Sequence, residues 1–464
     1  MVVLDATIVN VALPAIRRGL HLDTSELQWV VNAYLLTLGG LILLGGRLGD
    51  HFGRKRVYLI GGLIFSTASL AGGVAPNGGV LLAARAVQGV GAALLAPGTL
   101  SLLTAAYTEP RARRRALAVW STTAASGGAL GVFLGGALTD VLGWRSVLFV
   151  NVPLGVLVLV LGGMALPQTV RRVGPAKPLD VPGALTVTAA LTALVYGVVQ
   201  TASYSWGSTR TLAVFAVAAV LFAVAGVIES RASNALIPFA ILRRGPVATA
   251  TTMMVIHGAV VTATIYFESL YLQQVRGYNP FDAGLLLMPF ALLAIATPTL
   301  ASSVTSRHGP RRVAIASIVV EIGGIVWLSR WGAHGSILTE LVIPSMVLSI
   351  GASICFFSMS VLLTSDMERD HSGLGSGLFN AGRQVGGSLG LAALTVVATA
   401  HTRSLLAAHH GAVADADARG YGLALLTGAG LLGVGIVVVA MHTNRRGGRP
   451  ATAVDAESRA VELA

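Results

Sequence analysis

The sequence has few charged residues and a single cysteine. Only 11% of its 464 residues are charged, against about a quarter in an ordinary soluble protein. Cys355 stands alone, which excludes an internal disulfide bond and a metal cluster built from cysteines. The sequence also lacks the Gly-x-x-x-x-Gly-Lys-Ser/Thr loop that cradles nucleotide phosphates, so ATP could drive this protein only through another subunit. A soluble multidomain protein is excluded.

Long apolar stretches take up most of the chain. Hydrophobic residues make up 54% of it, the mean hydropathy is +0.75, and stretches of about 20 residues recur, the length that crosses a bilayer as a helix. Strands of a membrane barrel would alternate apolar and polar residues, and these stretches do not. We predict an all-α polytopic membrane protein with fourteen spans, near 1–16, 28–46, 57–75, 79–106, 116–139, 146–166, 182–201, 211–228, 247–272, 283–304, 313–328, 341–364, 377–400 and 421–442.

The excess of positive charge indicates membrane orientation. The formal net charge is +12, and 22 of the 32 Lys and Arg residues fall on one set of alternate joints between spans. Basic loops stay in the cytoplasm, so both termini are predicted to be cytoplasmic. Nucleic-acid binding needs the charge on one face and is not expected. His401, His409 and His410 have no acidic or cysteine companions at ligand spacing, so a loop, and no metal site, is predicted there.

The first span is short, because only 16 residues precede Arg17. No basic segment leads into it and no small-residue cleavage site follows, so a cleaved signal peptide is a poor interpretation. We expect the true start of the protein to lie upstream of Met1.

The chain repeats itself weakly. The segment 46–56 after the second span is echoed by 303–312 after the tenth, which is the second span of a second set of six. The prediction is an N-terminal six-helix half (1–166), a central linker with two extra helices (167–246), a C-terminal six-helix half (247–442) and a disordered cytoplasmic tail (443–464). Parallel repeats of this kind are typical of transporters with a site between the halves.

Four segments go beyond general hydropathy: Leu4–Pro14 in the first span, Gly46–Arg56, Arg85–Ala93 in the fourth span, and Gly127–Gly136 in the fifth. Together, in this order and spacing, they make the chain resemble the major facilitator superfamily, in its 14-span drug:proton antiporter branch (EmrB/QacA type). The resemblance implies a fold of two six-helix halves plus two central extra helices, and proton-coupled export.

Asp5 is the first candidate site residue. A carboxylate near the bilayer centre costs about 2.5–3.5 kcal/mol on insertion scales, so it is a functional candidate, although a packing hydrogen bond would also explain it. Arg85 lies within reach of Asp5 if the first and fourth spans pack together, and an alternative is that it reaches the headgroups. The resemblance implies that Asp5, Arg85 and Gln88 take part in proton coupling.

The segment 46–56 contains Gly46, Asp50, Gly53 and Arg54. Anchoring by positive charge explains the arginine and lysine residues but leaves Asp50 unexplained. The resemblance implies that Asp50 and Arg54 belong to a charge network of a gating loop, which latches one conformation.

The fifth span carries Gly127, Gly131 and Gly135 on one helix face, with Gly136 beside them. Small residues at this interval let helix backbones touch, which is a sufficient explanation by packing alone. The antiporter motif that this segment resembles has Pro after its central Gly, where this chain has Val132. That departure leaves the direction of transport open.

The ninth span carries His257, Thr264 and Glu268 on one face, which would suit a wet cavity wall or a cation path; Glu268 could equally just meet interfacial water. Glu321 lies in the middle of the eleventh span with no evident partner. Further polar residues predicted to line a cavity or join helices are Asn32, Asn380, Arg383, Gln384 and Ser388.

The predicted function is export of small amphipathic organic compounds by proton antiport and alternating access. A proton-coupled importer or a uniporter of the same fold is the alternative. A membrane enzyme is not expected, because no paired acid and base or metal cluster stands at one membrane face; a receptor without transport is equally unsupported. We predict no cofactor other than the proton, no nucleotide, a monomer, and a place in a bacterial cytoplasmic membrane.

Overall fold

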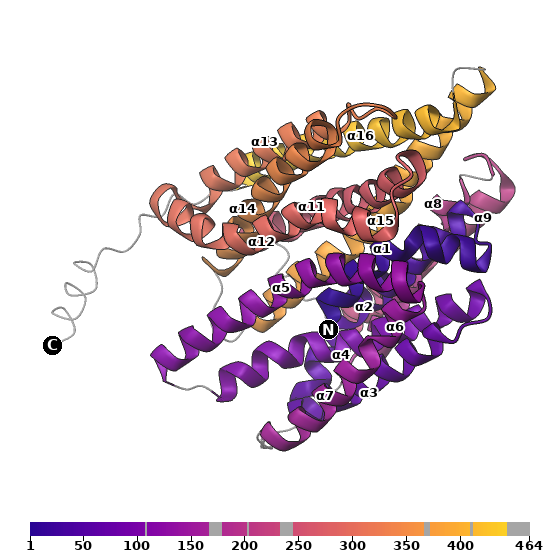
Figure 1. Cartoon of the computed structure of the whole chain (residues 1–464). Helices are drawn as coiled ribbons and strands as arrows, with labels where there is room; N and C mark the ends of the chain where they lie inside the picture. Colours follow the sequence, from indigo (N-terminus) through magenta and orange to yellow (C-terminus); the bar gives the residue numbers. More distant parts are fainter. Residues whose placement is uncertain are drawn as a thin grey trace, which may run out of the picture.

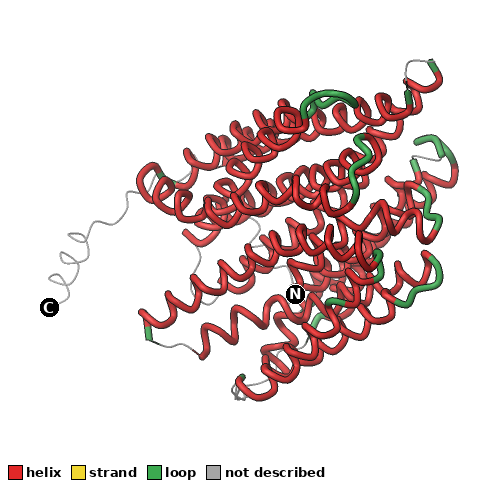
Figure 2. The backbone as a smooth tube through the Cα atoms, in the orientation of Figure 1, coloured by secondary structure: helices red, strands yellow, loops and turns green. Residues whose placement is uncertain are grey.

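A computed structural model describes residues 1–106, 109–166, 179–201, 204–232, 245–365, 372–408 and 412–442. This part of the chain consists of helices joined by short loops (Figure 2). The helices are α1 (Val2–Leu20), α2 (Thr24–Phe52), α3 (Arg54–Gly73), α4 (Gly78–Ala106), α5 (Pro110–Leu142), α6 (Ser146–Phe149), α7 (Asn151–Ala165), α8 (Val181–Gln200), α9 (Thr209–Arg231), α11 (Gly245–Leu270), η1 (Tyr271–Val275), α12 (Pro280–His308), α13 (Pro310–Leu328), η2 (Leu338–Val342), α14 (Ile343–Ser365), α15 (Ser372–Ala407) and α16 (Val413–His442).

Each of the fourteen predicted spans overlaps one long helical segment of the described chain, if α6 with α7, α11 with η1, and η2 with α14 are each taken as one. Ten of these segments are long and apolar enough to cross a membrane. The other four are α1, α3, α5 and α13. Charged residues interrupt α1 and α13, α3 opens with three basic residues, and the fully described apolar stretch of α5 is Ser126–Leu142.

The helices extend beyond the predicted apolar stretches, so several predicted boundaries were wrong. The first span was placed at 1–16, yet α1 continues through Arg17 to Leu20 and ends where His21 adopts a left-handed conformation. Asp23 then caps α2: its carboxylate accepts from the backbone N–H of Glu26, and the Glu26 side chain accepts from the N–H of Asp23. Hydropathy marks the apolar stretch, whereas capping groups mark where a helix begins and ends.

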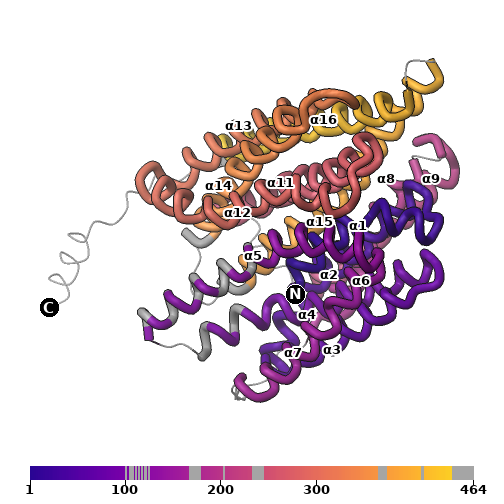
Figure 3. The backbone as a smooth tube through the Cα atoms, in the orientation of Figure 1, coloured from indigo at the N-terminus to yellow at the C-terminus, as the bar shows by residue number. Residues whose placement is uncertain are grey.

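The helices form two groups with a pair packed at their side. In Figure 1, α1–α7 occupy the lower part of the molecule, and α11–α14 and α16 the upper part. Figure 3 shows α5 and α12 side by side, and this pair forms one extensive contact between the groups while α2 with α15 forms another. The central pair, α8 and α9, packs through α8 against α2 and α15.

The weak sequence repeat has a counterpart in the backbone. Gly53 separates α2 from α3 with φ 97°, and Gly309 separates α12 from α13 with φ 81°. Only glycine adopts such values without strain. The prediction of a loop over 46–56 was wrong, because α2 continues to Phe52 and α3 begins at Arg54, so Gly53 alone breaks the helix. Two helices thus turn on one glycine in each group.

The two ends of the bundle are named here by one residue each. The Arg17 end holds the joints α1–α2, α3–α4 and η1–α12, and the Gly53 end holds the joints α2–α3 and α12–α13. Toward the Arg17 end, Ser269 donates to the carbonyl of Asn10 (2.8 Å) and Gln273 donates to the carbonyl of Val11 (2.8 Å). The two groups are therefore hydrogen-bonded to each other near this end.

Candidate functional site

Asp5 accepts hydrogen bonds from three buried side chains. Arg85 Nη1 lies 2.6 Å from its Oδ2, while Gln88 Nε2 and Asn151 Nδ2 lie 2.7 and 2.8 Å from its Oδ1. Asp5 and Asn151 are wholly inaccessible to solvent, and Arg85 is 2% exposed. The structure thus brings together Asp5, Arg85 and Gln88, and adds Asn151, which the sequence analysis did not single out.

Arg85 keeps partners of its own besides Asp5. Its Nη1 donates to Gln88 Oε1 (2.8 Å) and its Nε to the carbonyl of Val30 (3.0 Å). The guanidinium carbon lies 4.4 Å from the ring centroid of Tyr34. A cation over an aromatic face is stabilised further when both are buried, as they are here. The burial of Arg85 excludes the alternative in which it reaches the headgroups.

Close helix packing places these side chains. A Cβ on Gly89 would lie 2.6 Å from the carbonyl oxygen of Tyr34, so only glycine lets α4 approach α2 this closely. Asn151 opens α7 directly after the short helix α6. Ser69 of α3 accepts from Gln88 Nε2 (2.7 Å) and closes the cluster. The sequence did not indicate Tyr34, Ser69 and Asn151, because a single polar residue in an apolar stretch does not show which way its side chain faces in the folded protein.

The cluster places an acid and a base in direct contact inside the helix bundle. Aspartate and guanidinium neutralise each other in a site closed to water, where an unpaired charge is costly. A proton on Asp5 would add a donor to a carboxylate that now only accepts hydrogen bonds. Arg85 would keep its contacts with Gln88, the Val30 carbonyl and the Tyr34 ring. A proton on Asp5 would therefore remove the negative charge that Arg85 now balances.

At the Gly53 end, Asp50 and Arg54 pair across the glycine turn. Arg54 Nη2 lies 2.9 Å from Asp50 Oδ1, and both side chains are exposed to solvent. Lys55 donates to the carbonyls of Gly163 and Leu166 (2.8 and 2.7 Å), which ties α3 to the end of α7. Gly46, within α2, faces Pro97 of α4. The Asp50–Arg54 contact and the tie to α7 lie where the sequence analysis placed a charge network.

The glycines of α5 lie at two helix contacts. A Cβ on Gly131 or Gly135 would lie 2.8 Å from the carbonyl oxygens of Leu4 or Ile8 in α1, and one on Gly136 would lie 2.5 Å from that of Pro280 in α12. Gly127 faces α1 more loosely, at 3.8 Å. The α5 helix is continuous through Val132. Two adjacent faces of α5 therefore contact α1 and α12, and α5 joins the two groups of helices.

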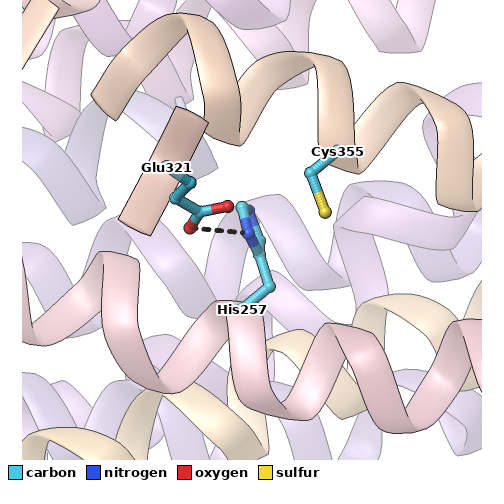
Figure 4. A group of neighbouring side chains, drawn as sticks. All are labelled: His257, Glu321 and Cys355. Carbon is cyan, nitrogen blue, oxygen red and sulfur yellow. Dashed lines mark ion pairs between the residues drawn. The ribbon is translucent and has the colours of Figure 1, made fainter. Parts of the chain in front are cut away.

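The polar face of α11 lies within the C-terminal group of helices. His257 Nδ1 lies 3.2 Å from Glu321 Oε1 of α13, so Glu321 has a partner that the sequence did not indicate (Figure 4). Glu268 accepts a hydrogen bond from Ser345 of α14, and Thr264 donates to its own helix. All of these side chains are buried. In this structure they face neighbouring helices and not an open cavity, and Glu268 does not meet interfacial water.

The polar residues of α15 lie near the contact with α2. Ser388 donates to Asn32 Oδ1 (3.0 Å), with both residues wholly buried. Gln384 packs against Gly39 of α2, and Asn380 donates to its own helix. The guanidinium carbon of Arg383 lies 5.8 Å from the ring centroid of Phe356 in α14, and the same side chain interacts electrostatically with Tyr34 of α2. Arg383 thus stands between the two groups of helices.

A cavity that sequence reasoning missed lies between the groups at the Arg17 end. It has a volume of about 230 Å³, and polar side chains from α1, α15 and α16 line it together with aromatic rings from α11 and α16. They include Arg17, Tyr266, Arg403, Asp417 and Tyr421. No single stretch of sequence indicates this cavity, because α1, α2, α11 with η1, α15 and α16 all contribute to its lining.

Of the three histidines predicted to lie in a loop, one falls within the described residues and two do not. His401 lies within α15, so its placement in a loop was wrong. His409 and His410 lie outside the described residues, as do the parts 167–178 and 233–244 of the predicted linker and the tail 443–464.

The helical architecture and the buried ionic cluster define the class: a multi-pass helical membrane protein built from two packed groups of helices. A family model of the Major Facilitator Superfamily matches residues 1–391. The chain belongs to this superfamily and is a membrane transporter of small molecules, not an enzyme.

Curated relatives cover nearly the whole chain. The puromycin resistance protein pur8 of Streptomyces alboniger is 34% identical over 93% of this chain and 86% of its own. The cephamycin export protein CmcT of Amycolatopsis lactamdurans is 38% identical over 89% of this chain and 86% of its own.

The fold has counterparts among solved structures. A bacterial homologue of the human lysosomal transporter Spinster superimposes with a TM-score of 0.69 at 16% identity, covering 97% of this chain and 96% of that one. At this identity the likeness concerns the fold alone.

Proposed function

We propose that this protein exports small amphipathic organic compounds, antibiotics among them, in exchange for protons. The observation that carries the proposal is the buried Asp5–Arg85–Gln88 cluster in a chain whose relatives bear the names of resistance and export proteins. A buried acid and base inside a transporter are costly and mark a coupling site.

The proposed cycle uses competition for the Asp5 carboxylate. With Arg85 paired to Asp5, the groups of helices meet near the Arg17 end, and substrate enters from the Gly53 end. Opening of the Arg17 end lets a proton reach Asp5 and displaces Arg85, and return of the pair after closure releases the proton at the Gly53 end. The Gly53 end is assigned to the cytoplasm because most basic residues belong to that set of joints.

The proton gradient suffices for this work. A proton entering down 100 mV gains about 2.3 kcal/mol, and a gradient of one pH unit adds about 1.4 kcal/mol. About 3.7 kcal/mol supports a roughly 500-fold gradient of a neutral solute at one proton per molecule. For a monovalent cation exchanged one for one, only the pH part of the driving force remains.

Finer features belong to the same proposal. Fourteen helices cross the bilayer, with α8 and α9 as the extra pair of the 14-span antiporter branch, and two six-helix halves rock about them. The protein acts as a monomer in a bacterial cytoplasmic membrane, with both termini in the cytoplasm, and uses no cofactor other than the proton.

The second candidate function is proton-coupled import or uniport. Val132 favours it, because α5 has no proline where the exporter motif has one and runs on as a continuous helix. Direction of transport separates the candidates.

The test expresses the protein in a bacterial host without its own major efflux pumps and measures cellular accumulation of puromycin and of a lipophilic cationic dye. We expect cells that contain the protein to accumulate less of each compound than the empty host. A protonophore, or the Asp5→Asn substitution, should raise accumulation to the level of the empty host. Higher accumulation would identify an importer, and a level unchanged by the protonophore would identify a uniporter.

A further inference from the structure

Three potential metal ligands from three helices meet in the C-terminal group of helices. His257 of α11, Glu321 of α13 and Cys355 of α14 each offer one ligand atom, and these atoms lie within 4.8 Å of one another. Figure 4 shows the carboxylate, the imidazole and the thiol directed toward one region between the helices. Cys355 and Glu321 are wholly buried, and His257 is 5% exposed.

Three polar atoms of this cluster lack hydrogen-bond partners, while the Cys355 thiol has Ser317 beside it. Both carboxylate oxygens of Glu321 and Nδ1 of His257 are buried without a hydrogen bond. The 3.2 Å contact between His257 Nδ1 and Glu321 Oε1 brings the two side chains together without the alignment of a hydrogen bond. Buried polar atoms without partners are rare, and an ion that the structure does not contain is one explanation for them.

The donor set selects the kind of ion. Imidazole nitrogen, carboxylate oxygen and thiolate sulfur are the three ligand types of zinc, and three protein ligands with an open fourth position are common at zinc. The ion itself deprotonates a coordinating thiol. A carboxylate and a thiolate carry two negative charges, which one divalent cation neutralises inside the membrane.

We propose that His257, Glu321 and Cys355 bind one zinc ion, which links α11 to α13 and α14. Zinc–ligand bonds of about 2.0–2.3 Å place tetrahedral ligands about 3.5 Å apart. The present atoms lie within 4.8 Å of one another, so they need to approach by about 1.3 Å at most. The single cysteine of the sequence excludes a metal cluster built from several cysteines. A site with one thiolate and two ligands of other types remains compatible with it.

The test uses the full-length protein purified in detergent, stripped with a chelator and incubated with Zn²⁺. After removal of free ion, we expect one zinc per chain by elemental analysis, and retention reduced at least tenfold in Cys355→Ser, Glu321→Gln and His257→Gln. His401→Gln is the matched control and keeps its zinc. Elution as a single species in size-exclusion chromatography shows that each variant is folded.

A second measurement needs no variant. Co²⁺ bound to the stripped wild-type protein gives a sulfur-to-cobalt charge-transfer band if Cys355 is a ligand. Absence of this band, or zinc retention that the three substitutions leave unchanged, overturns the proposal. A protein that retains no zinc while Glu321→Gln abolishes proton movement also overturns it, and assigns the cluster to proton transfer. The zinc and cobalt readouts do not depend on the proposed export activity.

Discussion

The Asp5 carboxylate of α1 accepts hydrogen bonds from side chains of α4 and α7, and these donors differ in charge. Arg85 supplies the countercharge, while Gln88 and Asn151 hold the same oxygen, Oδ1. A hydrogen bond to a charged group contributes about 1.5–3 kcal/mol. Loss of a neutral donor therefore disturbs the cluster without leaving an unpaired buried charge.

Asn151→Leu tests this point. The substitution keeps the branched shape of the side chain with the same number of heavy atoms and removes one donor from Asp5. We therefore expect drug-driven proton movement to fall about tenfold, since 1.4 kcal/mol is a factor of ten. The measurement is the initial rate of proton movement in vesicles, at equal amounts of protein. Thr67→Val, on the exposed face of α3, is the control and should change the rate little. Equal rates for Asn151→Leu and wild type would show that Asn151 has no role in coupling.

At the scale of the helix, α5 depends on glycine where it touches α12. A Cβ on Gly136 would lie 2.5 Å from the Pro280 carbonyl oxygen, a distance that real Cβ atoms do not adopt. Gly136→Ala should therefore separate α5 from α12 and lower the apparent Tm in detergent. Gly430→Ala is the matched control, because nothing lies within 4 Å of that position on α16 and alanine is the better helix former. A Tm for Gly136→Ala equal to or above that of Gly430→Ala would contradict the packing described.

Prediction from sequence succeeds at this scale for physical reasons. Apolar stretches of membrane length located all fourteen helical segments, because lipid leaves a backbone few alternatives to helix. The segments' ends were less accurate: α1 runs past Arg17 because the helix stops at a cap and not at the first charge. The proximity of Asp5 and Arg85 could be anticipated since each needs a partner, whereas the pairing of His257 with Glu321 depends on helix rotations that one sequence does not give.

At the scale of the whole molecule, the Asp50–Arg54 pair should affect the conformational change of transport more than the stability of the fold. Exposed ion pairs contribute about 0–1 kcal/mol, so Asp50→Asn should leave the apparent Tm within about 2 °C of wild type. If the pair latches one conformation, the substitution still slows substrate efflux severalfold. Thermal unfolding and efflux from preloaded cells, measured on the same variant, separate the two effects. A large loss of Tm would show that Asp50 is a structural residue instead.

Alternating access also requires the contact near the Arg17 end to open. Gln273 and Val11 join the two groups of helices there. In a Cys355→Ser background, Val11→Cys with Gln273→Cys and a short bifunctional crosslinker should stop transport, and a cleavable crosslinker should restore it on reduction. Each single cysteine variant treated in the same way serves as the control. Transport that continues after complete crosslinking would show that this contact does not open.

The most direct test of the central claim is proton movement through Asp5. Inside-out vesicles with an established pH gradient receive a panel of neutral and cationic lipophilic compounds, and the gradient is followed with a fluorescent pH indicator. We expect at least one compound to collapse the gradient with wild type and with Asp140→Asn, whose acid is exposed at the end of α5, and not with Asp5→Asn. Collapse that persists in Asp5→Asn, or transport of labelled substrate by wild type without proton movement, would contradict proton antiport through Asp5.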